Sequence, residues 1–189
     1  MVKQRIRKAY RNPSLDDHIR RERTLSEVSI LHDAKMAGVK VPSIIGVEPG
    51  TNTFVMTHID GTLARDSLDE MSPRDATRLF KKLGVMIGLL HLAGIVHGDL
   101  TTSNIVVTPS GDPFIVDFGM ARRSVDPEDR GVDLHLLQRS ITTSHLKEAS
   151  PLVKTLASGY AKTAGKKVHE SSWAKAREIS RRGRYFAIR

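Results

Sequence analysis

The sequence predicts an α+β fold in two lobes, a minimal sheet with one long helix followed by a reduced, mostly helical part. Three observations predict it: strand-like runs surround one long helical stretch in residues 1–57, an apolar helical stripe follows Ser72, and a further strand pair lies near residue 110. The lobes are expected to divide at a crossing segment, into residues 1–57 and 58–189. A chain of 189 residues is long enough to bury a core in such a fold.

The elements of the first lobe follow from alternation and from turn residues. Residues 2–6 alternate as in a strand, and residues 16–37, rich in Arg, Glu and Leu and ended by Gly38, predict a helix. Residues 44–47 and 54–56 flank Glu-Pro-Gly-Thr-Asn, which predicts a hairpin. These elements would form a small sheet with a single helix.

The second lobe is expected to begin with a helix at Ser72-Pro73, since Ser is a preferred cap and Pro suits the first helical position. Apolar residues recur at helical spacing until Gly94: Ala76, Leu79, Phe80, Leu83, Met86, Ile87 and Leu90. Later helices are expected to start at about Val132, at Ser150-Pro151 and at Ser172-Trp173.

The residues that could carry chemistry gather between residues 96 and 121. Asp99 precedes Asn104, and the apolar runs 105–107 and 114–116, joined by a turn with Gly, predict a hairpin that leads into Asp117-Phe118-Gly119. Because a hairpin places its outer ends side by side, Asn104 and Asp117 are expected to converge. Such an oxygen-rich pair suits Mg²⁺ carrying the phosphates of a nucleotide. Asp99, beside this metal, could orient or deprotonate an attacking hydroxyl or water.

This order of Asp, Asn and Asp-Phe-Gly resembles the phosphoryl-transfer site of the protein kinase-like fold. The resemblance implies ATP and Mg²⁺ as cofactors. It also implies a lysine that contacts phosphates from a strand and pairs with a Glu on the next helix. Lys3 matches that lysine and Glu27 its partner, with Glu22 as the competing choice.

Residues 56–61 would then cross between the lobes, where backbone groups from Met56 to His58 could bond an adenine edge. A core position for Met56 and an ordinary loop after a strand are the alternatives. His97 and Asp133 are expected to hold the loop around Asp99 through hydrogen bonds, and His91 to be structural.

Several departures argue against an ordinary protein kinase. No glycine-rich loop precedes Lys3, which is expected to weaken nucleotide binding. Asp99 is followed by Leu-Thr-Thr without the usual Lys, and Gly98 stands where protein kinases place an Arg. The stretch from Gly119 to Asp133 is too short for a regulated activation loop. Water or the protein's own serine is therefore an easier acceptor than a broad range of proteins.

Composition indicates a soluble, cytoplasmic protein that meets polyanions. The chain has no cysteine and no apolar stretch long enough to span a bilayer. Its formal net charge is +9, and residues 161–189 carry nine Lys or Arg against two acids. Residues 3–23 are also basic. RNA is the expected polyanion, and a solvated surface or an acidic protein partner is the alternative.

Over nearly its whole length the chain resembles one family, the small, RIO-like atypical kinases of the KEOPS complex, related to the p53-related protein kinase. The resemblance is carried by these runs: Val-Lys-Gln-Arg-Ile-Arg-Lys-Ala-Tyr-Arg-Asn-Pro, Arg-Arg-Glu-Arg-Thr-Leu-Ser-Glu, His-Gly-Asp-Leu-Thr-Thr-Ser-Asn, Asp-Phe-Gly-Met-Ala, Glu-Asp-Arg-Gly-Val-Asp-Leu-His and Arg-Arg-Gly-Arg. An archaeal source is expected. Family members carry a Gly-Ala-Glu-Ala-like segment before the lysine strand, which is absent here.

The family resemblance implies a non-specific serine/threonine kinase that phosphorylates itself and hydrolyses ATP in support of threonylcarbamoyladenosine formation in tRNA. The implied partners are the other KEOPS subunits, chiefly the tRNA threonylcarbamoyltransferase subunit, with tRNA or that subunit at the basic tail. Asp99 would be catalytic, Asn104 and Asp117 would hold Mg²⁺, and Lys3 with Glu27 would position phosphates.

Two alternatives remain open at this stage. One is a catalytically silent scaffold that uses the kinase shape to bridge subunits and RNA. The other is a small-molecule phosphotransferase of the aminoglycoside kinase type, which shares His-Gly-Asp. Those enzymes usually lack Asp-Phe-Gly and carry a larger helical insertion, for which this chain has no room.

Overall fold

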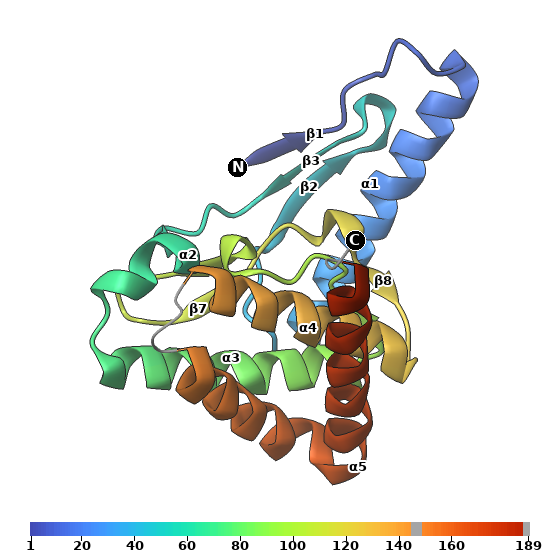
Figure 1. Ribbon diagram of the computed structural model, residues 1–189. Helices are drawn as coiled ribbons and strands as arrows, with labels where there is room; N and C mark the ends of the chain where they lie inside the picture. The colour runs from blue at the N-terminus through green and yellow to red at the C-terminus, as the bar shows by residue number, and fades with distance from the viewer. Residues whose placement is uncertain (145–148, 187–189) are drawn as a thin grey trace.

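The computed structural model describes residues 1–144 and 149–186 and confirms the α+β prediction. Small sheets and one long helix occupy the N-terminal part of the chain, and helices make up most of the rest (Figure 1). One continuous apolar core runs from Ile30 and Phe54 in the N-terminal part to Leu83 and Leu156 between the later helices.

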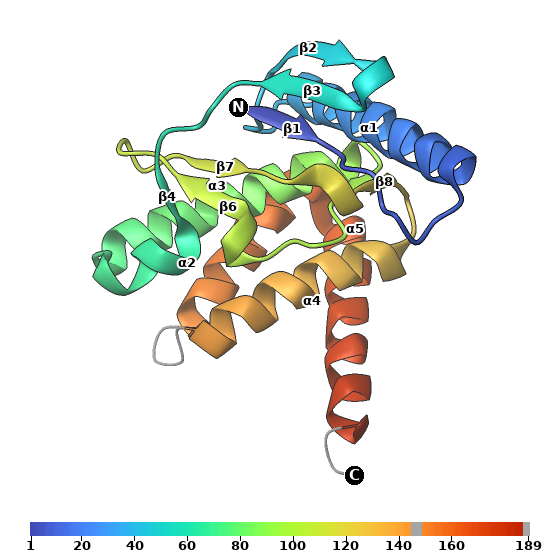
Figure 2. The same ribbon diagram turned by 90° about the horizontal axis from the view of Figure 1, so that it is seen from above.

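The N-terminal sheet has three antiparallel strands in the order β1 (Val2–Gln4), β3 (Thr53–Met56) and β2 (Ile44–Glu48). The predicted hairpin of β2 and β3 is confirmed, with its turn formed by a short 3-10 helix at Pro49–Thr51. Lys3 pairs with Phe54 in the centre of the β1–β3 ladder. Helix α1 (Pro13–Met36) lies alongside this sheet (Figure 2).

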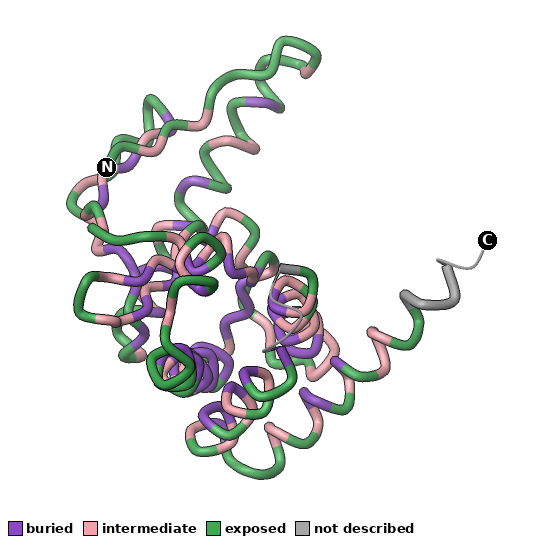
Figure 3. The backbone as a smooth tube through the Cα atoms, turned by 60° about the vertical axis from the view of Figure 1, so that its left-hand side comes forward, coloured by how far each residue is buried: buried purple, intermediate pink, exposed green. Residues whose placement is uncertain are grey.

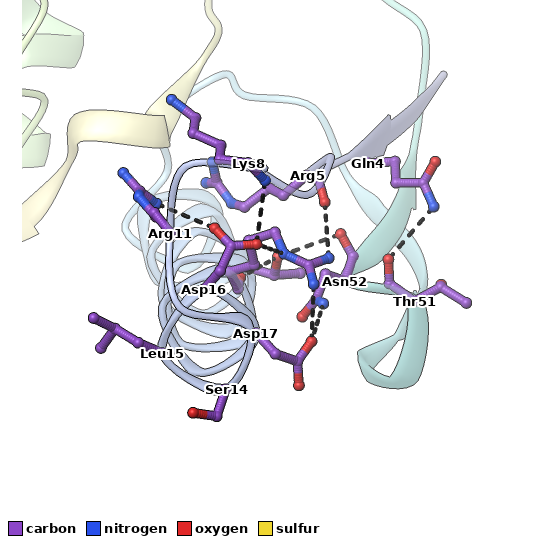
Figure 4. A network of polar contacts seen from close by, with 12 residues as sticks. Gln4, Arg5, Lys8, Arg11, Ser14, Leu15, Asp16, Asp17, Thr51 and Asn52 are labelled. Atoms are coloured by element: carbon purple, nitrogen blue, oxygen red, sulfur yellow. Dashed lines mark hydrogen bonds and ion pairs between the residues drawn. The ribbon is translucent and has the colours of Figure 1, made fainter.

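Helix α1 begins three residues before the predicted start at Asp16, because Asn12 caps it. The Asn12 side chain accepts hydrogen bonds from Ser14 N at 3.1 Å and Leu15 N at 3.5 Å. Asp16 is instead a buried anion that binds Arg20 Nε at 2.9 Å, Arg11 at 3.4 Å and the Lys8 N–H at 3.3 Å (Figure 4). This network fastens the loop after β1 to the first turns of α1 and so fixes the path of the chain between strand and helix.

Two smaller sheets lie between the N-terminal sheet and the later helices. One has the order β4 (Thr62–Leu63), β6 (Ile105–Val107) and β7 (Pro113–Ile115), and the other pairs β5 (Ile95–Val96) with β8 (Arg122–Arg123). The predicted hairpin is confirmed as β6–β7, with Ile105 opposite Ile115. Short helical turns flank it: η3 (Thr102–Asn104) before β6 and η4 (Phe118–Met120) after β7.

The remaining part is built from α2 (Ala64–Ser67), followed by a 3-10 turn at Leu68–Glu70, and from α3 (Pro73–Leu92), α4 (Pro127–Ser144) and α5 (Ala149–Phe186). The start of α3 is confirmed, because Ser72 Oγ accepts from Asp75 N at 3.2 Å. Helix α4 was expected to start near Val132 but begins at Pro127.

Helix α5 bends sharply at Gly165, whose φ of 76° is not helical. We call residues 149–164 its N-terminal arm and residues 166–186 its C-terminal arm; the two arms are distinct in Figure 1. The prediction of a new helix at Ser172 was therefore wrong in position, since the break lies at Gly165 and Ser172 is inside the C-terminal arm. The start expected at Ser150-Pro151 is confirmed within one residue.

Helix α3 and the N-terminal arm of α5 approach each other closely through glycines. A Cβ atom at Gly84 would lie 2.2 Å from Leu156 O, and one at Gly159 would lie 2.3 Å from Lys81 O. Figure 3 shows buried residues gathered among the later helices, while the loop between β1 and α1 is mostly exposed. No described helix has the length and apolarity to cross a membrane.

Candidate functional site

The side chain of Glu27 joins β1 to α1 through two cations. Its carboxylate is 2% exposed, and its two oxygens bind Lys3 Nζ at 2.6 Å and Arg5 Nη2 at 2.5 Å. The structure thus brings together Lys3 and Glu27, while Glu22 is exposed and lies 4.0 Å from His18. Sequence reasoning missed Arg5, although the alternation of β1 places it on the same face as Lys3. Glu27 is therefore a buried acid shared by Lys3 of β1 and by Arg5, the residue that directly follows this strand.

Lys3 also reaches the residue that opens the Asp-Phe-Gly turn. Lys3 Nζ lies 2.6 Å from Asp117 Oδ1, so one ammonium group connects β1, α1 and η4. Asp117 has φ 59°, a left-handed conformation, and its Oδ1 accepts the Gly119 N–H at 3.3 Å. Partial burial alone would raise the pKa of the Asp117 carboxyl, but the hydrogen bond and charge of Lys3 outweigh it, and the pKa lies below its usual value. Asp117 is therefore ionised at neutral pH.

Asp99 and Asn104 form the second half of the site. Asn104 Nδ2 donates to Asp99 Oδ2 at 3.0 Å and to the Asp99 carbonyl at 2.8 Å. The backbone bond from Val116 N to Asn104 O, 2.9 Å long, holds the end of β7 beside Asn104. Asn104 and Asp117 therefore flank the open end of one hairpin, as the sequence predicted, and Asp99 is exposed beside them.

Asp133 of α4 holds the loop that carries Asp99 through hydrogen bonds to its backbone, as expected. The fully buried carboxylate accepts the backbone N–H of His97 at 2.6 Å and of Gly98 at 2.8 Å. The His97 ring contributes Nε2 to the Val116 carbonyl at 3.0 Å and packs edge-on against Phe118. These bonds tie the loop, the end of β7 and the Asp-Phe-Gly turn into one unit.

Gly98 has a conformational reason to be glycine. Its φ is +79°, and a Cβ atom there would lie 2.4 Å from the Met120 carbonyl oxygen. The arginine that protein kinases carry at this point would be strained and would collide with the turn after Asp117. The departure noted in the sequence is thus built into the contact between the Asp99 loop and η4.

The segment after β3 does not share one environment. Met56 is a buried core residue, and its backbone N–H and carbonyl are paired with Met1 at 2.9 and 2.7 Å. His58, two residues on, is exposed. A backbone contact to an adenine edge therefore stays a prediction for the groups after Met56.

A pocket of about 230 Å³ opens between α1 and η4 and was not anticipated from the sequence. It is lined by Arg23, Ser26, Glu27, Phe118, Gly119, Met120 and Ala121. The pocket therefore lies between Glu27 and the Asp-Phe-Gly turn.

The donor set fits a hard cation that accompanies a nucleotide. Because Asn104 uses its amide nitrogen to hold Asp99, its carbonyl oxygen is left as an acceptor. Asp117 offers an ionised carboxylate at the same hairpin end. Mg²⁺ typically takes one or two protein oxygens and completes its coordination with water and phosphate oxygens. Asn104 and Asp117 can supply the protein oxygens.

Comparison with known proteins places this chain in a family. Residues 2–142 match the RIO domain family. The KEOPS complex subunit Bud32 of Pyrococcus abyssi is 39% identical over 98% of this chain and 84% of its own length. The EKC/KEOPS complex subunit bud32 of Dictyostelium discoideum is 35% identical over 87% of this chain and 67% of its own.

A third relative is longer. A probable bifunctional tRNA threonylcarbamoyladenosine biosynthesis protein of Methanothermobacter thermautotrophicus is 40% identical over 98% of this chain, which spans 33% of that protein. The chain belongs to the Bud32 family of RIO-domain atypical kinases. A RIO kinase domain implies nucleotide binding, which agrees with the cofactor class expected from the sequence.

Proposed function

We propose that this protein is a Mg²⁺- and ATP-dependent atypical kinase or ATPase that acts as a KEOPS subunit in threonylcarbamoyladenosine modification of tRNA. The observation that carries the chemical part is the single cluster formed by Lys3, Glu27 and Asp117 next to Asp99 and Asn104. The relatives' names support the biological part, since they are KEOPS subunits and a tRNA threonylcarbamoyladenosine biosynthesis protein.

In this proposal each residue has one task. Lys3, oriented by Glu27, would bind the phosphates, and Asn104 and Asp117 would hold a Mg²⁺ ion, which would neutralise the phosphate charge. Asp99 accepts the proton of the attacking hydroxyl or water, while the oxygen of that hydroxyl or water forms a bond to the γ-phosphorus. The bond from that phosphorus to the bridging oxygen breaks, and ADP leaves with the bond's electrons. Residues 1–57 and 58–189 would be the two lobes that close over the nucleotide.

The acceptor in this proposal is water or a hydroxyl of the protein itself. From Gly119 the chain reaches α4 at Pro127 with only the short strand β8 between, which leaves little backbone on which to dock a peptide. The partners would be the other KEOPS subunits, chiefly the threonylcarbamoyltransferase subunit, and tRNA at the basic C-terminal end. The site of action would be the cytoplasm.

Turnover of γ-labelled ATP tests the proposal, with and without the transferase subunit and tRNA. We expect label in free phosphate, or on a serine of the protein, and its loss in Asp117→Ala. Glu48→Ala, which removes an exposed carboxylate at the end of β2, is the matched control and should leave turnover unchanged. Absence of turnover in every mixture, with partner binding intact, would refute the enzymatic part and leave a scaffold.

A further inference from the structure

A series of polar side chains leads from the Asp99 loop into α5. Asp133, which holds that loop, lies 3.3 Å from His91 Nε2 through its Oδ2 atom. The other ring nitrogen of His91, Nδ1, lies 2.9 Å from the Tyr160 hydroxyl. That hydroxyl lies 3.3 Å from Ser172 Oγ, which also accepts Arg130 Nε at 3.1 Å. Five side chains from α3, α4 and α5 therefore form one hydrogen-bonded series.

The series is buried throughout. His91, Asp133, Tyr160 and Ser172 are each at most 2% exposed, and Arg130 is 8% exposed. Because a carboxylate can only accept, His91 Nε2 donates to Asp133. Burial raises the pKa of the Tyr160 phenol more than Ser172 and Arg130 lower it, so the hydroxyl keeps its proton at neutral pH. Buried groups of this kind have no water to replace a lost partner, so each fixes the position of the next.

The Tyr160–Ser172 contact crosses the bend of α5. Tyr160 lies in the N-terminal arm, which packs against α3 at van der Waals limits through Gly84 and Gly159. Ser172 lies beyond Gly165, in the C-terminal arm. The N-terminal arm is therefore held by close backbone contact with α3. The C-terminal arm packs closely on α4 at Gly131 and in addition meets the Asp99 loop through the polar series.

The C-terminal arm has a second fixed point on α4. Lys175 binds Glu128 at 3.0 Å, and Arg182 binds the other oxygen of Glu128 at 3.0 Å. These are partly exposed pairs of modest strength. Ser172, Trp173 and Ala176 are buried residues of this arm, and Ser172 is the one that joins it to the polar series.

We propose that His91 and Tyr160 are positioning residues, which couple the seating of the C-terminal arm at Ser172 to the geometry of the Asp99 loop. The catalytic role of Asp99 rests on the proposed function, but the coupling itself does not. The coupling predicts that removing the Tyr160 hydroxyl loosens the loop, although the hydrogen bonds described for that hydroxyl go to His91 and Ser172 and not to the loop.

Amide hydrogen exchange of the full chain tests the coupling without any assay of activity. Tyr160→Phe keeps the ring, and Ser172→Ala keeps the helix. Both variants should accelerate exchange of the His97 and Gly98 amides by about tenfold or more. Leu156→Val is the control, because Leu156 lies on the same arm as Tyr160, is equally buried and loses only apolar contact. The loss of thermal stability is measured for all three variants. Equal acceleration in the control, or none in Tyr160→Phe, would overturn the proposal.

The double variant separates a series from independent contacts. If Ser172 acts through Tyr160, the pair Tyr160→Phe and Ser172→Ala should accelerate loop exchange no more than Tyr160→Phe alone. Additive acceleration would mean that the two side chains act separately, which contradicts the coupling. Trp173 is the single tryptophan of the chain and is 6% exposed, so its fluorescence reports changes around Ser172, at the α5 end of the series. Its emission should shift in Ser172→Ala and not in Leu156→Val.

Activity provides the last readout. Tyr160→Phe should lower kcat for ATP turnover severalfold and leave KM unchanged, because Lys3, Glu27 and Asp117 lie outside the series. A change in KM alone would contradict the assignment. If the wild-type protein turns over no ATP, the proposed function fails, and the exchange measurements still decide whether the loop is coupled to α5.

Discussion

Replacing Asp133 by Asn is expected to destabilise the protein and to disorder the loop that carries Asp99. The carboxylate is fully buried and accepts three donors: the His97 N–H at 2.6 Å, the Gly98 N–H at 2.8 Å and His91 Nε2 at 3.3 Å. Asn retains one oxygen and turns an NH₂ group toward at least one of these donors. Two donors then face each other with no acceptor between them.

The size of the effect follows from the number of donors left without a partner. A buried donor that loses its acceptor costs about 1–3 kcal/mol, so Asp133→Asn should lower the free energy of unfolding by roughly that amount. Asp133→Ala leaves all three donors unpaired and should cost about 3–9 kcal/mol on the same scale. Since a whole domain is stable by only about 5–15 kcal/mol, the Ala variant should be close to unfolding and the Asn variant should remain folded.

Thermal unfolding measures this prediction. For a chain of this size a loss of 1 kcal/mol lowers Tm by about 2–4 °C. Asp129→Asn is the matched control, since it makes the same chemical change on the same helix at a residue whose carboxylate meets Arg122 near the surface. We expect that control to change stability by less than about 1 kcal/mol. A Tm for Asp133→Asn equal to that of the control, with loop amides still protected, would refute the reasoning.

Three further predictions concern backbone conformation, packing and pH. Gly98→Ala should abolish most ATP turnover, because its Cβ would lie 2.4 Å from Met120 O. Gly111→Ala, at a similar φ of +74° with nothing described within 4 Å, should cost only about 1–2 kcal/mol and leave turnover intact. Gly84→Ala should lower stability by about 1–3 kcal/mol or more, as measured by denaturant unfolding, because its Cβ would lie 2.2 Å from Leu156 O and α3 and α5 must separate. The hydrogen bonds from Lys82 and then Lys40 lower the pKa of Asp112 to about 2, so its stabilising effect should be present above pH ~4 and lost as pH falls toward 2; Asp112→Asn should flatten the Tm profile in that window.

The arrangement of the candidate site was predictable because its residues are close in sequence or sit on regular elements. The β6–β7 hairpin follows from two apolar runs and a turn with Gly, and it alone brings Asn104 beside Asp117. Lys3 and Glu27 are far apart in the chain, but the family pattern pairs them. Arg5 was missed although strand alternation puts it on the face of Lys3, because the pattern assigns that face only one basic residue.

Helix ends were less predictable where a polar residue has two possible uses. Asp16 looked like part of a helix start, but Asn12 is the cap, and Asp16 is buried among Arg11, Arg20 and the Lys8 N–H. Local sequence shows only that an acid lies near a helix terminus. It does not show whether that acid caps the helix or is buried inside a network.

Ser172 shows the same ambiguity with a consequence for function. A serine before an apolar run is typical of a helix start, which is why a helix was expected there. Its hydroxyl instead lies in the core, where it meets Tyr160 and Arg130, and the bend falls at Gly165, where a positive φ is easily adopted. Other polar residues could replace a serine that only caps a helix, but Ser172 has hydrogen-bond partners on two other segments. Since those partners lie 12 and 42 residues away, no local pattern could reveal the series that joins α5 to Asp133.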